Sequence, residues 1–78
     1  KEITFNVFPN PTSDIWSISN ENLEISSVEV YDLNGKLVFT ETSNSTIISI
    51  NALNLKDGVY VSRLITSSET KIVKLLKN

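Results

Sequence analysis

Side chains that could do chemistry are few in this chain, and the most reactive types are missing. The 78 residues include no cysteine and no histidine, which removes thiolates and disulfides together with the commonest general base and transition-metal ligand. Serines are plentiful, but a serine nucleophile would need Lys56 or Lys71 as its base. No serine stands in a strained, glycine-flanked turn. We therefore expect no enzyme activity and no cofactor.

Three carboxylates could bind an ion, because Asp14, Asp32 and Asp57 are all expected in turns and loop oxygens suit calcium. The alternative is that each aspartate caps its own turn backbone. Capping is favoured, since no loop carries several carboxylates at metal-ligand spacing, and calcium binding at one turn stays open. The acids are also expected at strand ends and polar faces, which does not suit a glycoside hydrolase.

Two aromatic residues could serve in binding. Trp16 could stack on a sugar ring, but its alternation with Ile18 points it inward, toward the core of a small domain. Tyr60 could present its hydroxyl to a partner. Packing at a sheet corner, with the hydroxyl bonded to backbone, is the favoured interpretation.

Charge is near balance overall but unevenly distributed. The net charge is −2, which predicts no strongly basic face for nucleic acid. From Lys56 onward, five cations and two acids give +3, whereas the preceding residues carry two cations and seven acids, giving −5. The terminal lysines either discourage aggregation at an edge strand or serve recognition. No apolar run approaches ~18 residues, so we expect no membrane span.

The elements that position these groups are predicted to be strands. Apolar and β-branched residues alternate with period two, and the chain has only two prolines and two glycines, which are Pro9, Pro11, Gly35 and Gly58. The predicted strands lie around residues 3–7, with Ile3, Phe5 and Val7 on one face, and around 16–18, then at about 25–32, 36–41, 46–50, 58–66 and 71–76.

Seven short strands separated by turn signals predict an all-β chain with an immunoglobulin-like antiparallel β-sandwich. We expect residues 1–78 to form a single domain cut from a larger secreted protein. Residues 42–45 are expected to form a loop. In the segment 51–55, the leucines are expected to plug one end of the core.

The turn at Asn34 and Gly35 has two possible registers. Asn34-Gly35 could form a two-residue type I′ hairpin. Alternatively, Asp32 opens a type I turn with Gly35 in the left-handed conformation, which adds a bulge. The second is favoured, and it would place Val30 opposite Val38.

Several phrases together are typical of one family. An aromatic residue, Pro-Asn-Pro, two small polar residues and Asp occupy Phe8–Asp14, and the alternation of Trp16 and Ile18 follows. Val-x-Val-Tyr-Asp-Leu-x-Gly-Lys-x-Val, Leu-x-x-Gly-x-Tyr-Val and a lysine-alternating strand then follow in order, at Val28–Val38, Leu55–Val61 and Lys71–Lys77. The chain resembles the type A C-terminal sorting domain of proteins exported by the bacterial type IX (Por) secretion system. It departs from many members at Lys56-Asp57, where those have proline before a small residue.

The resemblance implies an address label rather than an enzyme. It implies a cargo that crosses the inner membrane by an N-terminal signal and then folds in the periplasm. The expected partners are the outer-membrane translocon and its shuttle proteins. A sortase-like cysteine peptidase at the surface often removes the domain. The expected location is the cell surface or exterior of a Gram-negative bacterium.

A signal read after folding has to be a surface of a folded module, and a terminal, basic edge strand can dock by strand addition. Residues of this predicted recognition surface are Lys71, Lys74, Leu75 and Lys77, with Gly58 and Tyr60 supporting it. The predicted motif and turn residues are Pro9, Asn10, Pro11, Asp14, Asn34, Gly35 and Asp57.

Two other functions remain open from the sequence. A fibronectin-like or carbohydrate-binding module would carry an exposed aromatic strip. A spacer or dimerisation domain could pair weakly with its own copy through the final strand.

Overall fold

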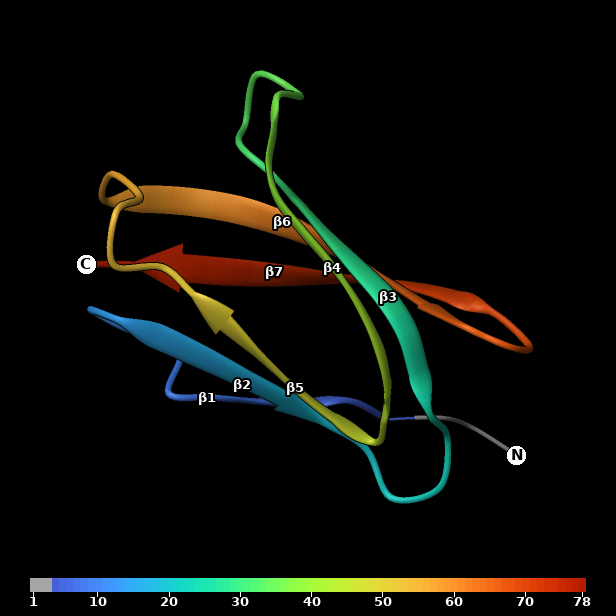
Figure 1. Cartoon of the computed structure of the whole chain (residues 1–78). Helices are drawn as coiled ribbons and strands as arrows, with labels where there is room; N and C mark the ends of the chain where they lie inside the picture. Colours follow the sequence, from blue (N-terminus) through green and yellow to red (C-terminus); the bar gives the residue numbers. More distant parts are fainter. Residues whose placement is uncertain (1–3) are drawn as a thin grey trace.

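Seven strands form in residues 4–78, the part of the chain that this computed structural model describes. They make two antiparallel sheets, one in the order β1-β2-β5 and one in the order β4-β3-β6-β7 (Figure 1). The predicted immunoglobulin-like sandwich is confirmed. The strands are β1 Asn6–Phe8, β2 Ile15–Ser19, β3 Ile25–Tyr31, β4 Leu37–Ser45, β5 Ile47–Asn51, β6 Gly58–Thr66 and β7 Thr70–Lys77.

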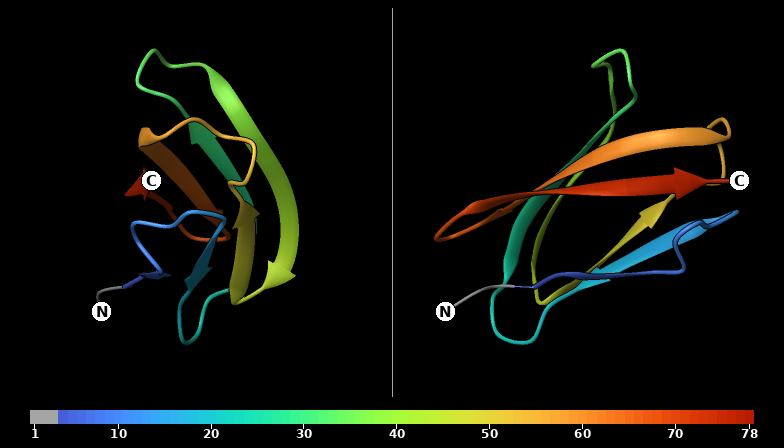
Figure 2. Two further views of the ribbon diagram at one scale, coloured as in Figure 1. Left: turned by 90° about the vertical axis from the view of Figure 1, so that its left-hand side faces the viewer. Right: turned by 180° about the vertical axis from the view of Figure 1, so that it is seen from behind.

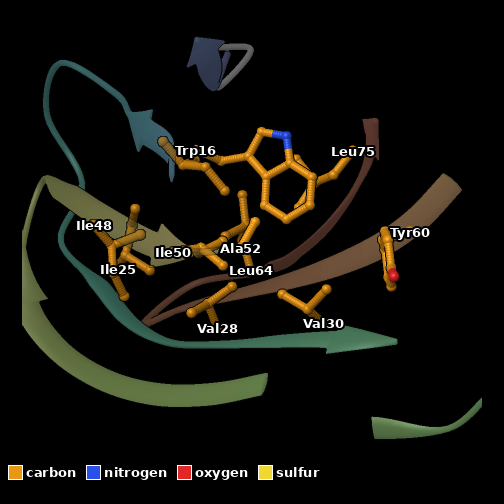
Figure 3. Close-up of a cluster of buried hydrophobic side chains, with 11 residues drawn as sticks. Trp16, Ile25, Val28, Val30, Ile48, Ile50, Ala52, Tyr60, Leu64 and Leu75 are labelled. Atoms are coloured by element: carbon orange, nitrogen blue, oxygen red, sulfur yellow. The ribbon is translucent and has the colours of Figure 1, made fainter. Parts of the chain in front are cut away.

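The core lies between the two sheets (Figure 2), and side chains from both layers point into it (Figure 3). Trp16 on β2 is fully buried, as its alternation with Ile18 predicts, so it cannot stack on a sugar. Its ring lies edge-on to Tyr60, with centroids 6.0 Å apart, an arrangement that aromatic pairs favour. The core comprises Trp16, Ile18, Ile25, Val28, Val30, Ile48, Ile50, Ala52, Tyr60, Leu64 and Leu75.

The hairpin between β3 and β4 uses the type I turn. The Gly35 N–H donates to the Asp32 carbonyl at 3.0 Å, and Gly35 has a φ of +84°, which only glycine adopts easily. The Asp32 carboxylate also accepts from the N–H groups of Asn34 and Lys36 at 2.9 and 3.0 Å. Asp32 therefore caps its own turn.

The predicted pairing of Val30 with Val38 is wrong. Tyr31 faces Leu37, but Val30 faces Phe39, so the register shifts by one residue between the two pairs. Val38 is the extra residue of a β-bulge. The bulge lets both Val38 and Phe39 pack partly against the core.

Three other expectations need correction or fall outside the structure. Residues 42–45 belong to β4 rather than to a loop, because Thr42 and Ser45 pair with β3. Leu53 is 64% exposed, whereas Ala52 is fully buried and Leu55 packs partly against the core. Ile3 lies outside the described residues.

No helix long and apolar enough to cross a membrane occurs in residues 4–78.

Candidate functional site

The C-terminal strand β7 lies at one end of the four-stranded sheet, beside β6 (Figure 2). The two strands pair without interruption, from Gly58 opposite Lys77 to Ile65 opposite Thr70. Successive side chains of a strand point to opposite faces. Since Val73 and Leu75 pack in the core, odd-numbered residues of β7 face inward and even-numbered residues face outward.

This alternation separates the predicted recognition residues. The side chain of Leu75 is fully buried, and Lys77 is only 8% exposed. The Lys77 ammonium donates to the Leu55 carbonyl at 2.8 Å and lies 3.9 Å from the exposed carboxylate of Asp57. Neither Leu75 nor Lys77 offers its side chain to a partner at the surface, which corrects the idea that both are contacted directly. Lys74 is exposed, and Lys71 is half-buried.

Asn10 bonds to the outer edge of β7 through its side chain. Its Oδ1 accepts from the Leu76 N–H at 2.8 Å, and its Nδ2 donates to the Lys74 carbonyl at 3.2 Å. One side-chain amide thus supplies the acceptor and the donor that a neighbouring strand would otherwise provide.

Thr12 continues this contact with its backbone. Its N–H donates to the Leu76 carbonyl at 3.0 Å, and its carbonyl accepts from the Asn78 N–H at 2.9 Å. Thr12 forms a parallel bridge with Lys77. The indole N–H of Trp16 also donates to the Leu76 carbonyl, at 3.1 Å. We call Asn10 and Thr12 the clasp, because together they hold the last residues of the chain in place.

The clasp is fixed by the turn that leads into β2. The Thr12 hydroxyl donates to the Ile15 carbonyl at 2.7 Å, and the Asp14 carboxylate accepts from the Ile15 N–H at 2.7 Å. The Asp14 carbonyl also accepts from Ala52 at 2.6 Å. Pro9 and Pro11 are exposed on either side of Asn10. The sequence predicts this segment as a turn, and its contact with β7 is the feature that sequence reasoning missed.

Gly58 and Tyr60 support the same end of β7 from the other side. Gly58 has a φ of +147°, a conformation that side-chain-bearing residues avoid. Tyr60 is buried, and its hydroxyl donates to the Lys56 carbonyl at 2.6 Å. The predicted packing role of Tyr60 is confirmed, and Tyr60 faces Leu75 across the sheet.

The first half of β7 is more exposed than the second half. Ile72 is 62% exposed and lies opposite Arg63 on β6. Arg63 contacts the Glu29 carboxylate at 3.5 Å. The Tyr31 hydroxyl donates to the same carboxylate at 2.9 Å, and this hydrogen bond raises the pKa of Tyr31 above its ordinary value.

The remaining predicted residues lie elsewhere. Asn34 and Gly35 form the tip of the β3–β4 hairpin, which projects away from β7 (Figure 1). Asp57 is exposed beside Lys77. Within residues 4–78, no three acidic side chains come together as a metal site would require.

The chain is similar to a known protein family and to a solved structure. The family described as "Secretion system C-terminal sorting domain" matches residues 6–78. Among solved structures, PorZ of Porphyromonas gingivalis, described as an essential bacterial surface component of the type-IX secretion system, is similar with a TM-score of 0.77 and 24% identity. The match covers 95% of this chain and 11% of that protein.

Two ulvan lyases also carry a similar segment. The ulvan lyase NLR42 of Nonlabens ulvanivorans is 33% identical over 75 residues, which cover 92% of this chain. An endo-acting ulvan lyase of Formosa agariphila is 37% identical over 71 residues, which cover 90% of this chain. The aligned region spans 14% of the length of each lyase.

Proposed function

The chain belongs to the family of secretion system C-terminal sorting domains, and on that premise we propose that it directs an N-terminal cargo through the outer membrane by the type IX system. The domain is then a substrate and an address label, and it has no catalytic role of its own. The matched lyases suggest the kind of cargo, a polysaccharide-degrading enzyme.

One observation carries this proposal: the C-terminal strand is held in place by residues near the start of the domain. Asn10 and Leu76 are 66 residues apart in the sequence, yet they hydrogen-bond at 2.8 Å. The surface around β7 therefore exists only once the whole module has folded. Such a surface suits a signal that is read on a folded protein in the periplasm.

The partners we propose are those of the secretion pathway. The outer-membrane translocon and its shuttle proteins would read the domain, and a sortase-like cysteine peptidase at the surface would remove it. The cargo would end at the cell surface or in the medium. The similarity in fold to PorZ, a surface component of that system, supports this setting.

We propose different roles for the residues around β7. Lys71 and Lys74 would meet the partner, because the Lys74 side chain is exposed and the Lys71 side chain is only half-buried. Leu75 and Lys77 would act from inside, by fixing the strand to the core and to the Leu55 carbonyl. Gly58 and Tyr60 would hold the corner beneath them.

A reporter fusion tests the proposal. The 78 residues are joined to the C-terminus of a periplasmic reporter and expressed in a bacterium with a type IX system. We expect the reporter at the cell surface or in the medium. Deletion of residues 71–78 should leave it in the periplasm, and export of the truncated fusion would contradict the proposal.

The deletion also removes Leu75 from the core, so a folded variant is needed beside it. Lys71→Glu combined with Lys74→Glu should reduce export while the domain still unfolds cooperatively. Lys36→Glu with Lys56→Glu is the matched control, since both lysines are exposed on other segments. Equal export of the two double variants would exclude a role for the β7 lysines.

A further inference from the structure

We propose that the outer edge of β7 from Thr70 to Lys74 is a docking edge for one extended strand of a partner protein, and that this strand carries acidic residues three positions apart with apolar residues between them. The inference rests on the proposed function and deepens it, because it names which edge is read and by what chemistry.

The direction of the backbone groups shows that this edge is available. The N–H and C=O of Leu76 point away from β6, since they bond to Asn10 and Thr12. The register with β6 is continuous along β7, so the backbone groups of Ile72 point the same way. Within residues 4–78, no strand pairs with β7 on that side except at the Thr12–Lys77 bridge.

The clasp sets the limit of the docking edge. Asn10 already bonds to the Lys74 carbonyl and to the Leu76 N–H. A strand that adds to β7 can use the N–H and C=O of Ile72 and the N–H of Lys74 without displacing the clasp. It must end opposite Lys74, so the edge accommodates a short segment only.

The charges on this short edge select an acidic strand. Lys71 and Lys74 lie on opposite faces of β7, because three positions separate them. Residues directly opposite on a paired strand come within about 5 Å of each other. Carboxylates facing Lys71 and Lys74 would therefore be paired on both faces, whereas Arg63 already contacts Glu29. The nearest acid along the chain, Glu69, lies in the turn before β7.

The two residues between the lysines favour apolar partners. Ile72 is 62% exposed, and Val73 packs only partly against the core. Cross-strand pairs of β-branched residues stabilise a sheet. The pattern acidic, apolar, apolar, acidic follows from the order Lys71, Ile72, Val73, Lys74.

A second copy of this chain is a poorer occupant. Antiparallel self-pairing about Ile72 would place Lys71 opposite Val73 and Lys74 opposite Thr70. Four lysines would then gather along one short seam, with no carboxylate from either strand between them. Such a seam offers none of the opposite-charge cross-strand pairs that stabilise a sheet.

Titration of the isotope-labelled domain with a short peptide tests the edge. The probe is acetyl-Thr-Glu-Val-Ile-Glu-Thr-amide, and the control replaces both glutamates with lysine. We expect weak binding, with a dissociation constant on the order of 1 mM, and shifts of the Ile72 and Lys74 amide resonances. The lysine peptide should bind about tenfold more weakly. Equal response to the two peptides, or shifts confined to other strands, would overturn the proposal.

A backbone variant separates strand addition from simple charge attraction. Ile72→Pro removes an outward N–H, at a type of position where edge strands tolerate proline. It should abolish the response to the acidic peptide, whereas Ile72→Thr, which keeps the N–H, should retain it. If concentration-dependent shifts at Ile72 appear without peptide, a second copy occupies the edge and the acidic-strand proposal is wrong.

The same variants in the reporter fusion distinguish a failure of the sorting function from a failure of the docking edge. Failure of the unchanged domain to export the reporter would contradict the proposed function itself. Export by the unchanged domain and equally by Ile72→Pro would leave the sorting function standing and refute the docking edge. Export by the unchanged domain and by Ile72→Thr, with loss in Ile72→Pro, is the expected result.

Discussion

The two halves of β7 share a strand and a neighbour, yet their surroundings differ. Along Thr70–Val73 the outer edge has no strand beside it in the described structure, and Ile72 is largely exposed. Along Lys74–Lys77 the clasp covers the edge, while Leu75 and Lys77 are buried. The first half is open to a partner, and the second half anchors the strand.

The difference shows why lysines at regular spacing in a sequence need not form one basic surface. Lys74 keeps its ammonium in water, where it is available to a partner. Lys77 lies at the anchored end, and its ammonium bonds to the Leu55 carbonyl. A buried lysine that is hydrogen-bonded serves the fold, so on the proposed function the recognition charge of β7 would come from Lys71 and Lys74.

The largest expected difference between the two halves of β7 is in the free energy of unfolding, when one buried and one exposed side chain are each truncated to alanine. Leu75→Ala should destabilise the domain by about 2–5 kcal/mol, because it leaves a cavity beside Trp16 and Tyr60. Ile72→Ala should change the free energy of unfolding by less than about 0.5 kcal/mol, as exposed positions usually do. Urea unfolding followed by Trp16 fluorescence measures both. Similar losses in the two variants would mean that the halves are not distinct.

The buried Lys77 and the exposed Lys74 should show a smaller difference in the free energy of unfolding, again with the buried position more sensitive. Lys77→Met keeps the apolar stem and removes the donor to the Leu55 carbonyl, which should cost about 1–2 kcal/mol. Lys74→Met is the matched control, and its effect should stay within about 0.5 kcal/mol. The same unfolding experiment applies, and a Lys77→Met domain as stable as the parent would show that the buried hydrogen bond contributes nothing.

Alternation along the strands allowed much of the fold to be predicted. The inward positions of Trp16 and Ile18 follow from period two, and the Asp32–Gly35 turn follows from local hydrogen-bonding chemistry. The bulge at Val38, which pairs Val30 with Phe39, could not be predicted, because it depends on how β4 packs over the core and not on the turn at Gly35. The strand structure of 42–45 depends on pairing with β3, which polar residues at an edge do not reveal.

The candidate site was also predictable only in part, because several of its contacts depend on residues that lie far apart in the sequence. A basic terminal strand is visible in the sequence, and within it Lys74 is exposed and Lys71 is half-buried. The burial of Lys77 and the contacts of Asn10 depend on tertiary neighbours that lie far away in the chain. Local rules interpret Pro-Asn-Pro as a turn, and nothing local indicates that its asparagine bonds to the last strand.

Removal of the Asn10 side chain from the clasp should increase amide exchange in the second half of β7 alone. Asn10→Ala removes two hydrogen bonds to the backbone, and the expected cost is about 1 kcal/mol, equivalent to an exchange rate about fivefold higher at the Leu76 amide. The Ile72 amide, which has no clasp partner, should exchange as before. Asn54→Ala, at an exposed turn position, serves as the control. Faster exchange along the whole strand would indicate that the clasp holds both halves.

The smallest expected effect is that of replacing Glu29, which contacts Arg63 beside the first half of β7. Glu29→Gln removes the carboxylate that Arg63 and Tyr31 share. Because the hydrogen bond to Glu29 is what raises the pKa of Tyr31, that pKa should fall toward its ordinary value of about 10, as measured by tyrosinate absorbance.

The stability of the domain depends on pH through Tyr31, because Glu29 accepts a hydrogen bond from the neutral phenol and so favours that form in the folded state. Its contribution to stability is complete below the ordinary pKa of tyrosine and is lost as pH rises through the higher folded-state pKa of Tyr31. Glu29→Gln should therefore lower the stability of the domain below the ordinary pKa of tyrosine, and its difference from the parent should disappear as pH rises through the folded-state pKa of Tyr31. It should also free Arg63 opposite Ile72, so the acidic peptide should bind up to about twofold more tightly. Amide exchange at Leu76 should be unchanged, because the clasped half has no contact with the Glu29 carboxylate in the described structure. A change in that exchange rate would show that the two halves of β7 respond together.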